Sequence, residues 1–173
     1  MRPAVVTAVL LLVCVLNAVT AQPGHTRTSP SEICERYPDK PCGDGWSYIA
    51  ENRCVKHFDT PKVYAAARYH CITIKSSPVS IHSEDELNNL LCLTWRLNPE
   101  LQPFWIGARK SGLYNRRFTY FDQTPFDFEG WYRDEPDNAT RDEDCIESNF
   151  KDWGYWNDVS CSEMRNFVCA KTV

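Results

Sequence analysis

Apolar residues recur at helical spacing in two places in the first half of the chain, and the first of these follows Thr60. Thr60 is a good N-cap, and Pro61 suits the first helical position because it has no backbone N–H to satisfy. Cys71 falls on the apolar face of this predicted helix, where it can tie the helix to the core. The apolar face consists of Val63, Ala66, Ala67, Cys71 and Ile74.

The second predicted helix begins after Ser83. Glu86 stands three residues beyond Ser83 and completes a capping box. Asn98-Pro99 ends the helix, because the residue before a proline avoids helical backbone angles. The apolar stripe consists of Leu87, Leu90, Leu91 and Trp95.

Short alternating or apolar runs predict strands around these helices. The segment 109–144 shows no sustained period but is dense in aromatic residues, which is typical of a packed loop. Helices followed by short strands, in segregated order, indicate the α+β class. The predicted strands cover residues 46–49, 54–58, 104–108, 145–147 and 167–170.

The N-terminus reads as a secretory signal peptide over residues 1–21. A basic start at Arg2 precedes an apolar run, and small residues stand before Gln22. The run is short for a membrane-spanning helix, so an uncleaved anchor is disfavoured. Residues 22–33 are polar and predict a flexible lead-in, which leaves 34–173 as the folded domain. The protein is therefore expected to be secreted.

Cysteine usage agrees with an extracellular protein. The chain has nine cysteines, of which Cys14 lies in the signal peptide. An even number in the remaining chain predicts a disulfide framework, although spacing alone leaves the pairing open. The net charge is −4 and no basic cluster stands out, so neither nucleic acid nor membrane insertion is expected. The remaining cysteines are Cys34, Cys42, Cys54, Cys71, Cys92, Cys145, Cys161 and Cys169.

Acidic residues gather late in the chain, within residues 134–144. Density alone is equally typical of a solvated acidic loop. Asn157 and Asp158 lie twelve and thirteen residues past Cys145 and add an amide and a carboxylate. Because calcium takes six to eight oxygen ligands, this combination favours a Ca²⁺ site. The acids are Asp134, Glu135, Asp137, Asp142, Glu143 and Asp144.

These residues, taken in order, resemble the C-type lectin-like domain in its long form. The likeness runs from about Cys42 to Lys171, and its specificity comes from the combination of motifs. The motifs are Cys42-x11-Cys54 enclosing Gly45-Trp46, Trp105-Ile106-Gly107-Ala108, Glu135-Pro136-Asp137, Glu143-Asp144-Cys145 and Trp156-Asn157-Asp158.

The resemblance implies a double-loop α+β fold with three disulfides: Cys42–Cys54, Cys71–Cys169 and Cys145–Cys161. Cys34 and Cys92 would then remain, and we expect them to pair with each other. The alternative is a pair of intermolecular bridges in a covalent dimer.

The resemblance also implies the site. Calcium and sugar would be bound by the same five residues, with Pro136 following a cis bond that aims its neighbours at the ion. Two adjacent sugar hydroxyls would bind the calcium. The five residues are Glu135, Asp137, Glu143, Asn157 and Asp158.

The chain departs from the family's usual motifs at several points. Glu135-Pro136-Asp137 matches neither the Glu-Pro-Asn of mannose binders nor the Gln-Pro-Asp of galactose binders. Arg109 and Lys110 stand where an auxiliary calcium site needs acids, so we expect that site to be missing or weak. Asn138-Ala139-Thr140 is a glycosylation sequon inside the binding loop.

The expected function is calcium-dependent binding of mannose- or fucose-type sugars, on glycans of host or microbial surfaces. The alternative is a domain of the same fold that binds a protein ligand. An enzyme is not expected, since a glycosidase needs a protonated carboxyl, and acids on a cation stay ionised. The oligomeric state is left open, with a homo-oligomer among the alternatives.

Overall fold

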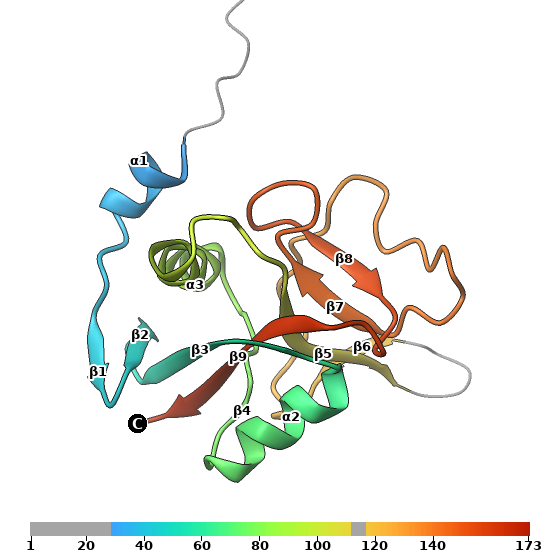
Figure 1. Ribbon diagram of the computed structural model, residues 1–173, viewed down its shortest axis with the longest axis horizontal. Helices are drawn as coiled ribbons and strands as arrows, with labels where there is room; N and C mark the ends of the chain where they lie inside the picture. Colours follow the sequence, from blue (N-terminus) through green and yellow to red (C-terminus); the bar gives the residue numbers. More distant parts are fainter. Residues whose placement is uncertain (1–28, 112–116) are drawn as a thin grey trace, which may run out of the picture.

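The computed structural model describes residues 29–111 and 117–173. Within them lie three helices and nine strands, drawn in Figure 1. The helices are α1 (Pro30–Glu35), α2 (Tyr64–Thr73) and α3 (Glu84–Leu97). The strands are β1 (Pro41–Gly43), β2 (Trp46–Ala50), β3 (Arg53–Lys62), β4 (Ser77–Pro78), β5 (Phe104–Ser111), β6 (Arg117–Tyr120), β7 (Cys145–Ser148), β8 (Trp156–Val159) and β9 (Arg165–Thr172).

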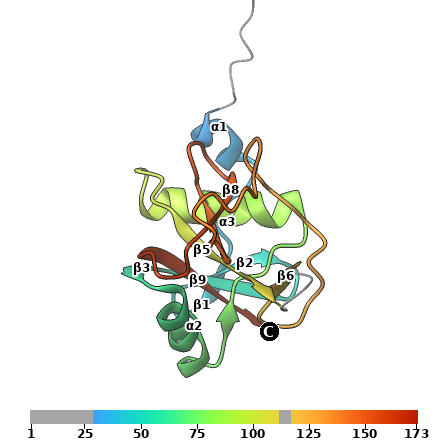
Figure 2. The same cartoon turned by 90° about the vertical axis from the view of Figure 1, so that its right-hand side faces the viewer.

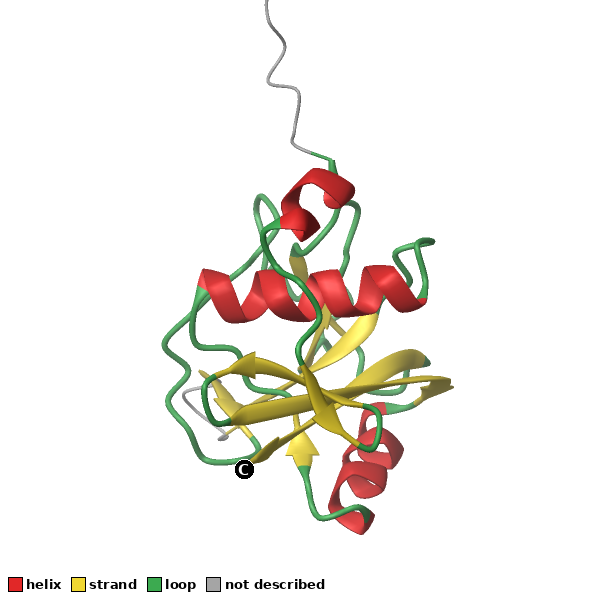
Figure 3. Cartoon of the chain, turned by 90° about the vertical axis from the view of Figure 1, so that its left-hand side faces the viewer, coloured by secondary structure: helices red, strands yellow, loops and turns green. Residues whose placement is uncertain are grey.

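The described strands form one mixed sheet in the order β1-β2-β3-β9-β5-β7-β8, with β4 on β9 and β6 on β5. All pairs are antiparallel except β5 with β9. The long β3–β9 pairing joins the start of the domain to its end. Figure 3 shows α3 and α2 on opposite sides of the strands. The α+β class expected from the sequence is confirmed.

Helix α2 begins later than the sequence predicts. Thr60 and Pro61 belong to β3, and Val63 is the N-cap. The strand continues to Lys62 because Lys62 pairs with Arg165 of β9 and accepts a hydrogen bond from Trp105 Nε1 at 2.7 Å. The buried face holds Tyr64, Ala67 and Cys71, whereas the expected core residues Ala66 and Ile74 are exposed.

Helix α3 matches its prediction closely. Ser83 is the N-cap and accepts from the backbone N–H of Glu86, and Asn98 is the C-cap. In a capping box the Glu86 carboxylate would accept from the backbone N–H of Ser83. Here it accepts from the backbone N–H of His82 at 2.9 Å, one residue earlier. Leu87, Leu90 and Leu91 are buried, while Trp95 is half-buried.

Helix α1 was not predicted, because its first residues fall within the polar lead-in. Ser29 caps it with a full capping box to Glu32. The helix is held against α3 by the Cys34–Cys92 disulfide and by Arg96, which donates to the carbonyl of Cys34 at 2.7 Å. Tertiary contacts thus order a segment whose composition alone indicates a flexible chain.

The remaining disulfides join Cys42 to Cys54, Cys71 to Cys169 and Cys145 to Cys161, the pairs implied by the family resemblance. Cys34–Cys92 is intramolecular. Cys71–Cys169 attaches α2 to β9, and Cys145–Cys161 closes the β7–β8 pair. Each cross-link limits the unfolded ensemble and so stabilises the fold.

The segment from β6 to β7 forms a long loop that packs through its aromatic residues. Phe118, Phe126, Phe128 and Trp131 contact the core around Trp156, which is fully buried. In Figure 2 this loop, drawn in orange, rises from β6 past α3 toward α1. The aromatic density therefore indicated a packed loop correctly, although β6 was missed. Tyr114 lies outside the described residues.

No helix of the described segments is long and apolar enough to cross a membrane. The predicted signal peptide and residues 22–28 lie outside the described residues.

Candidate functional site

Strand β8 places the Trp156-Asn157-Asp158 motif beside β7. Alternation along the strand buries Trp156 and Asp158 and leaves Asn157 half-buried. Asp158 lies opposite Ile146, and Asn157 lies opposite Glu147. The Cys145–Cys161 disulfide spans the pair, so this part of the site rests on rigid structure.

The long loop brings two further carboxylates to Asp158. Ligand oxygens of Glu135, Asp137 and Asp158 all lie within 4.8 Å of one another, so these three residues form a carboxylate cluster. The Glu135–Pro136 bond is cis. The backbone N–H of Asp137 donates to Asp158 Oδ1 at 3.0 Å, and that of Asn138 donates to Oδ2 at 3.2 Å. The loop is therefore fastened to β8 by the Asp158 carboxylate itself.

The carboxylate cluster lacks positive charge in proportion to its acids. Burial, together with the negative charges of Asp137 and Asp158, raises the pKa of Glu135 above its ordinary value. Two buried carboxylate oxygens, Oε2 of Glu135 and Oε2 of Glu143, have no hydrogen-bond partner among the described residues. Unpartnered carboxylate oxygens are costly when buried, and a hard divalent cation would satisfy them. The donor set thus fits calcium.

One cation is already supplied by the chain. Lys110 Nζ donates to Asp158 Oδ2 at 2.6 Å and to the carbonyl of Glu143 at 2.7 Å. The Lys110 side chain is 10% exposed and that of Asp158 is fully buried, so this is an interior ion pair. The ammonium also lies 5.1 Å from the centre of the Phe118 ring. Lys110 therefore attaches β5 to both halves of the site.

Sequence reasoning missed this role of Lys110, although a signal was present. Ile106 and Ala108 are buried on one face of β5, and alternation puts Lys110 on that same face. A lysine that continues a buried face must find a buried partner for its charge.

The two other residues of the expected set are placed differently. Glu143 is buried, but its carboxylate is outside the carboxylate cluster. The Asn157 amide donates through Nδ2 to Glu147 Oε1 at 2.9 Å. Glu147 also accepts from Arg165, so Asn157 belongs to a second polar network that the sequence did not suggest. The structure thus brings together three of the five expected ligands.

Asn138, the sequon residue, has a structural contact of its own. Its Oδ1 accepts from the backbone N–H of Glu143 at 3.2 Å, which closes the acidic loop on itself. Asn138 is half-buried and has a positive φ of 49°, which asparagine tolerates better than most residues. A glycan on Nδ2 would start within a few residues of the carboxylate cluster.

Comparison with known proteins agrees with this architecture. The family model described as "Lectin C-type domain" matches residues 60–171. C-type isolectin Sp-CL4 of Scorpaena plumieri is 44% identical over 142 residues, covering 82% of this chain and 96% of that protein. Galactose-specific lectin nattectin of Thalassophryne nattereri is 32% identical, covering 76% of this chain and 81% of that protein.

Among solved structures, herring type II antifreeze protein aligns with a TM-score of 0.69 at 28% identity, covering 76% of this chain and 99% of that one. The shared fold therefore extends to proteins whose names denote different ligands. With the matched domain, the related lectins and the double-loop architecture in agreement, the chain belongs to the C-type lectin domain family.

Proposed function

We propose that the protein is a secreted, calcium-dependent carbohydrate-binding protein. The observation that carries the proposal is the carboxylate cluster together with the two unpartnered buried oxygens of Glu135 and Glu143. Three converging carboxylates repel one another even though Lys110 pairs with Asp158, and a divalent cation relieves that repulsion. The predicted signal peptide supports secretion.

Calcium at this site would be held by Glu135, Asp137 and Asp158, and it would supply two coordination positions for sugar hydroxyls. Glu143 and Asn157 complete the proposed set, which requires the Asn157 side chain to turn from Glu147 toward the ion. Asp158 positions the loop, since it accepts from the backbone N–H groups of Asp137 and Asn138. The affinity is expected to be weak, about 10⁻⁴–10⁻³ M, as in other extracellular modules.

Lys110 sets a condition on this proposal. Its ammonium occupies Asp158 Oδ2, so a cation that binds Asp158 must use Oδ1 or displace the ammonium. Either outcome opposes calcium through like-charge repulsion. Lys110 is therefore expected to lower calcium affinity while keeping the loop ordered in its absence.

For the sugar, we propose mannose- or fucose-type ligands because Glu135 is retained. Asp137 argues against such ligands, because mannose binders have an asparagine at this position and a carboxylate lacks the hydrogen-bond donor of the amide. The related nattectin is named galactose-specific, so galactose is the competing ligand to test.

Affinity chromatography tests the proposal directly. The protein is passed over immobilised mannose and galactose with calcium, then eluted with EDTA. Retention on mannose with release by EDTA is the expected result. Retention on galactose alone would refute the sugar assignment, and retention unaffected by EDTA would refute calcium dependence.

Calorimetry with a matched pair of variants tests the site. Glu135→Gln removes one carboxylate of the cluster without changing its shape, and should abolish the heat of calcium binding. Glu129→Gln makes the same chemical change at an exposed position outside the cluster, and should bind calcium like wild type. Equal calcium heats in both variants would contradict the site.

A second candidate is a calcium-independent domain that binds a protein ligand. The Lys110–Asp158 ion pair favours it, because the site already contains a cation. The Asn138 sequon favours it too, because a branched glycan near the carboxylate cluster would compete with a sugar ligand. We propose that Asn138 is glycosylated in part, or carries a glycan directed away from the site. Sugar binding that appears only after Asn138→Gln would select the protein-ligand alternative.

A further inference from the structure

The hairpin of β5 and β6 separates two chemically different surfaces. Lys110 pairs with Phe118 on one face, and this face meets the carboxylate cluster. Arg109 pairs with Thr119 on the other face, one position along the strand. Because successive side chains of a strand point to opposite faces, the Arg109 guanidinium is directed away from the acids that bind Lys110.

The Arg109 face forms one wall of a pocket of about 460 Å³, here called the hairpin pocket. Helix α2 provides the opposite wall. No carboxylate lines this pocket within residues 29–111 and 117–173. Besides Lys110 and Tyr120, which also border the pocket, the lining groups that the argument uses are Tyr64, Arg68, Arg109, Ser111, Thr119 and Phe121.

Both arginines are available to a ligand. The Arg68 guanidinium lies 4.9 Å from the centre of the Phe121 ring, which orients its planar donors. In the part of the chain that the structure describes, neither Arg68 nor Arg109 forms a side-chain ion pair with an acid. Burial raises the pKa of Tyr64, the charges of Arg68 and Arg109 oppose that rise, and the charge of Asp122 adds to it.

A nearby acid is engaged elsewhere. Asp122 accepts from Ser80 Oγ at 2.6 Å and from Thr124 Oγ1 at 2.6 Å. Its carboxylate is therefore held by hydroxyl groups, and among the described residues it neither lines the hairpin pocket nor forms an ion pair with Arg68 or Arg109.

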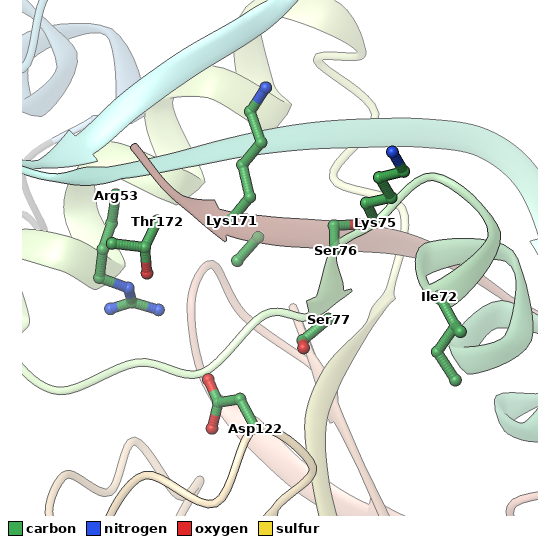
Figure 4. Close-up of a pocket in the computed structure, with 9 residues that line it drawn as sticks. Arg53, Ile72, Lys75, Ser76, Ser77, Asp122, Lys171 and Thr172 are labelled. Carbon is green, nitrogen blue, oxygen red and sulfur yellow. The ribbon is translucent and has the colours of Figure 1, made fainter.

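A second cationic pocket, drawn in Figure 4, provides the contrast. Figure 4 shows Arg53 and Asp122 facing each other across it. The Arg53 guanidinium donates to Glu86 at 2.7 Å and to the carbonyl of Ser80 at 2.8 Å, so its charge is already used within the fold. Of the three basic residues that line that pocket, Arg53, Lys75 and Lys171, Arg53 is thus used within the fold, and the Lys171 ammonium lies 4.5 Å from the centre of the Trp46 ring.

We propose that the hairpin pocket is a second, calcium-independent binding site for an anionic saccharide, through a sulfate ester or a carboxylate on the sugar. Two guanidinium groups match the planar or tetrahedral oxygens of such groups. The exposed hydroxyls of Ser111 and Thr119 suit the rest of a sugar. The volume exceeds that of a lone anion and falls within the range of small-molecule sites.

The test uses a heparin-derived hexasaccharide in EDTA, which removes any contribution from calcium. Arg68→Ala and Arg109→Thr should each weaken binding about tenfold, as expected for loss of a charge-assisted hydrogen bond. Arg36→Ala is the matched control, because Arg36 is exposed on α1 and carries the same charge; it should change affinity less than about twofold. Near-identical circular dichroism of all variants establishes that they are folded.

The outcomes separate clearly. Loss of binding after complete desulfation of the hexasaccharide assigns the sulfate ester, and retained binding assigns the carboxylate. Equal weakening in all three arginine variants, or no binding at physiological salt, overturns the proposal. A polyglutamate peptide that binds as tightly, with the same dependence on Arg68 and Arg109, overturns the assignment to saccharides. Glu135→Gln should bind the hexasaccharide normally, so failure of the calcium site would leave this result intact.

Discussion

Arg109 and Lys110 are adjacent on one strand and carry the same charge, yet they lie in opposite chemical surroundings. Lys110 is enclosed, with its ammonium on Asp158 and on the carbonyl of Glu143. Arg109 is exposed and faces a pocket without acids among its described lining residues. Strand alternation puts the two side chains on opposite faces, and the long loop covers the Lys110 face. One strand thus contributes a structural cation to an acidic site and a free cation to a basic pocket.

The two faces of the strand differ in the charge that surrounds them. The acidic face needs positive charge, and the fold supplies one unit of it through Lys110. Burial, together with the negative charges of Asp137 and Asp158, still raises the pKa of Glu135, and a bound cation would offset that negative charge. The Arg109 face carries positive charge and has no acid among its described lining residues. Changes at each face should therefore affect one binding activity and leave the other intact.

The largest effect is expected at Asp158. Asp158→Asn removes the acid that holds Lys110 and the loop, so it should abolish calcium binding. It should also reduce the free energy of unfolding in EDTA by about 3–5 kcal/mol, because the Lys110 charge stays buried without its partner. Urea denaturation measures this loss. The double variant Lys110→Met/Asp158→Asn should recover part of it, and no recovery would mean that the ion pair is unimportant for stability.

A smaller effect is expected from the neighbouring cations themselves. Lys110→Gln should tighten calcium binding about tenfold, because a competing positive charge is removed from Asp158. Arg109→Gln removes the same charge one residue earlier but on the other face, and should leave calcium affinity nearly unchanged. Calorimetry on both variants decides. Similar changes in the two would show that bulk charge, and not the contact with Asp158, governs affinity.

A third test concerns the donors available to a sugar. Asp137→Asn should weaken calcium by removing a carboxylate, yet strengthen mannose by about 1 kcal/mol by adding a donor. An unmatched hydrogen-bonding group costs about 1–3 kcal/mol when it is desolvated, and the low end applies because Asp137 is exposed. Asn157 already donates to Glu147, which makes the shortage of donors greater than the sequence suggested. Weaker mannose binding at saturating calcium would reject the donor argument.

The smallest effect is expected from pH. Because the pKa of Glu135 is raised, this carboxyl gains its proton at a higher pH than an ordinary glutamate. Calcium affinity should therefore fall as the pH drops through that raised range. Without calcium, the free energy of unfolding should instead rise as the pH drops through the same range, since protonation of Glu135 relieves its repulsion from Asp137 and Asp158. Calcium titrations at several pH values should show this slope, and the slope should flatten in Glu135→Gln.

Much of the fold was predictable because its signals are local. Helix α3 followed from Ser83, Glu86 and a leucine stripe, and five strands were found from short apolar or alternating runs. Helix α2 was found with its start misplaced, since the pairing of Lys62 with Arg165 is a contact across the sheet. Helix α1 depends on a disulfide and on Arg96 of α3, and no local pattern signals either.

The amino-acid sequence contains the residue types that a calcium site requires, together with the order of motifs that identifies the family. It could not determine which charges are neutralised within the fold. That Lys110 pairs with Asp158, while Arg109 meets no acid among the described residues, was decided only when β5 was placed between β9 and β7, with the loop closed over one face. The physical reason is that electrostatic interactions depend on distance and burial, which only the tertiary structure establishes.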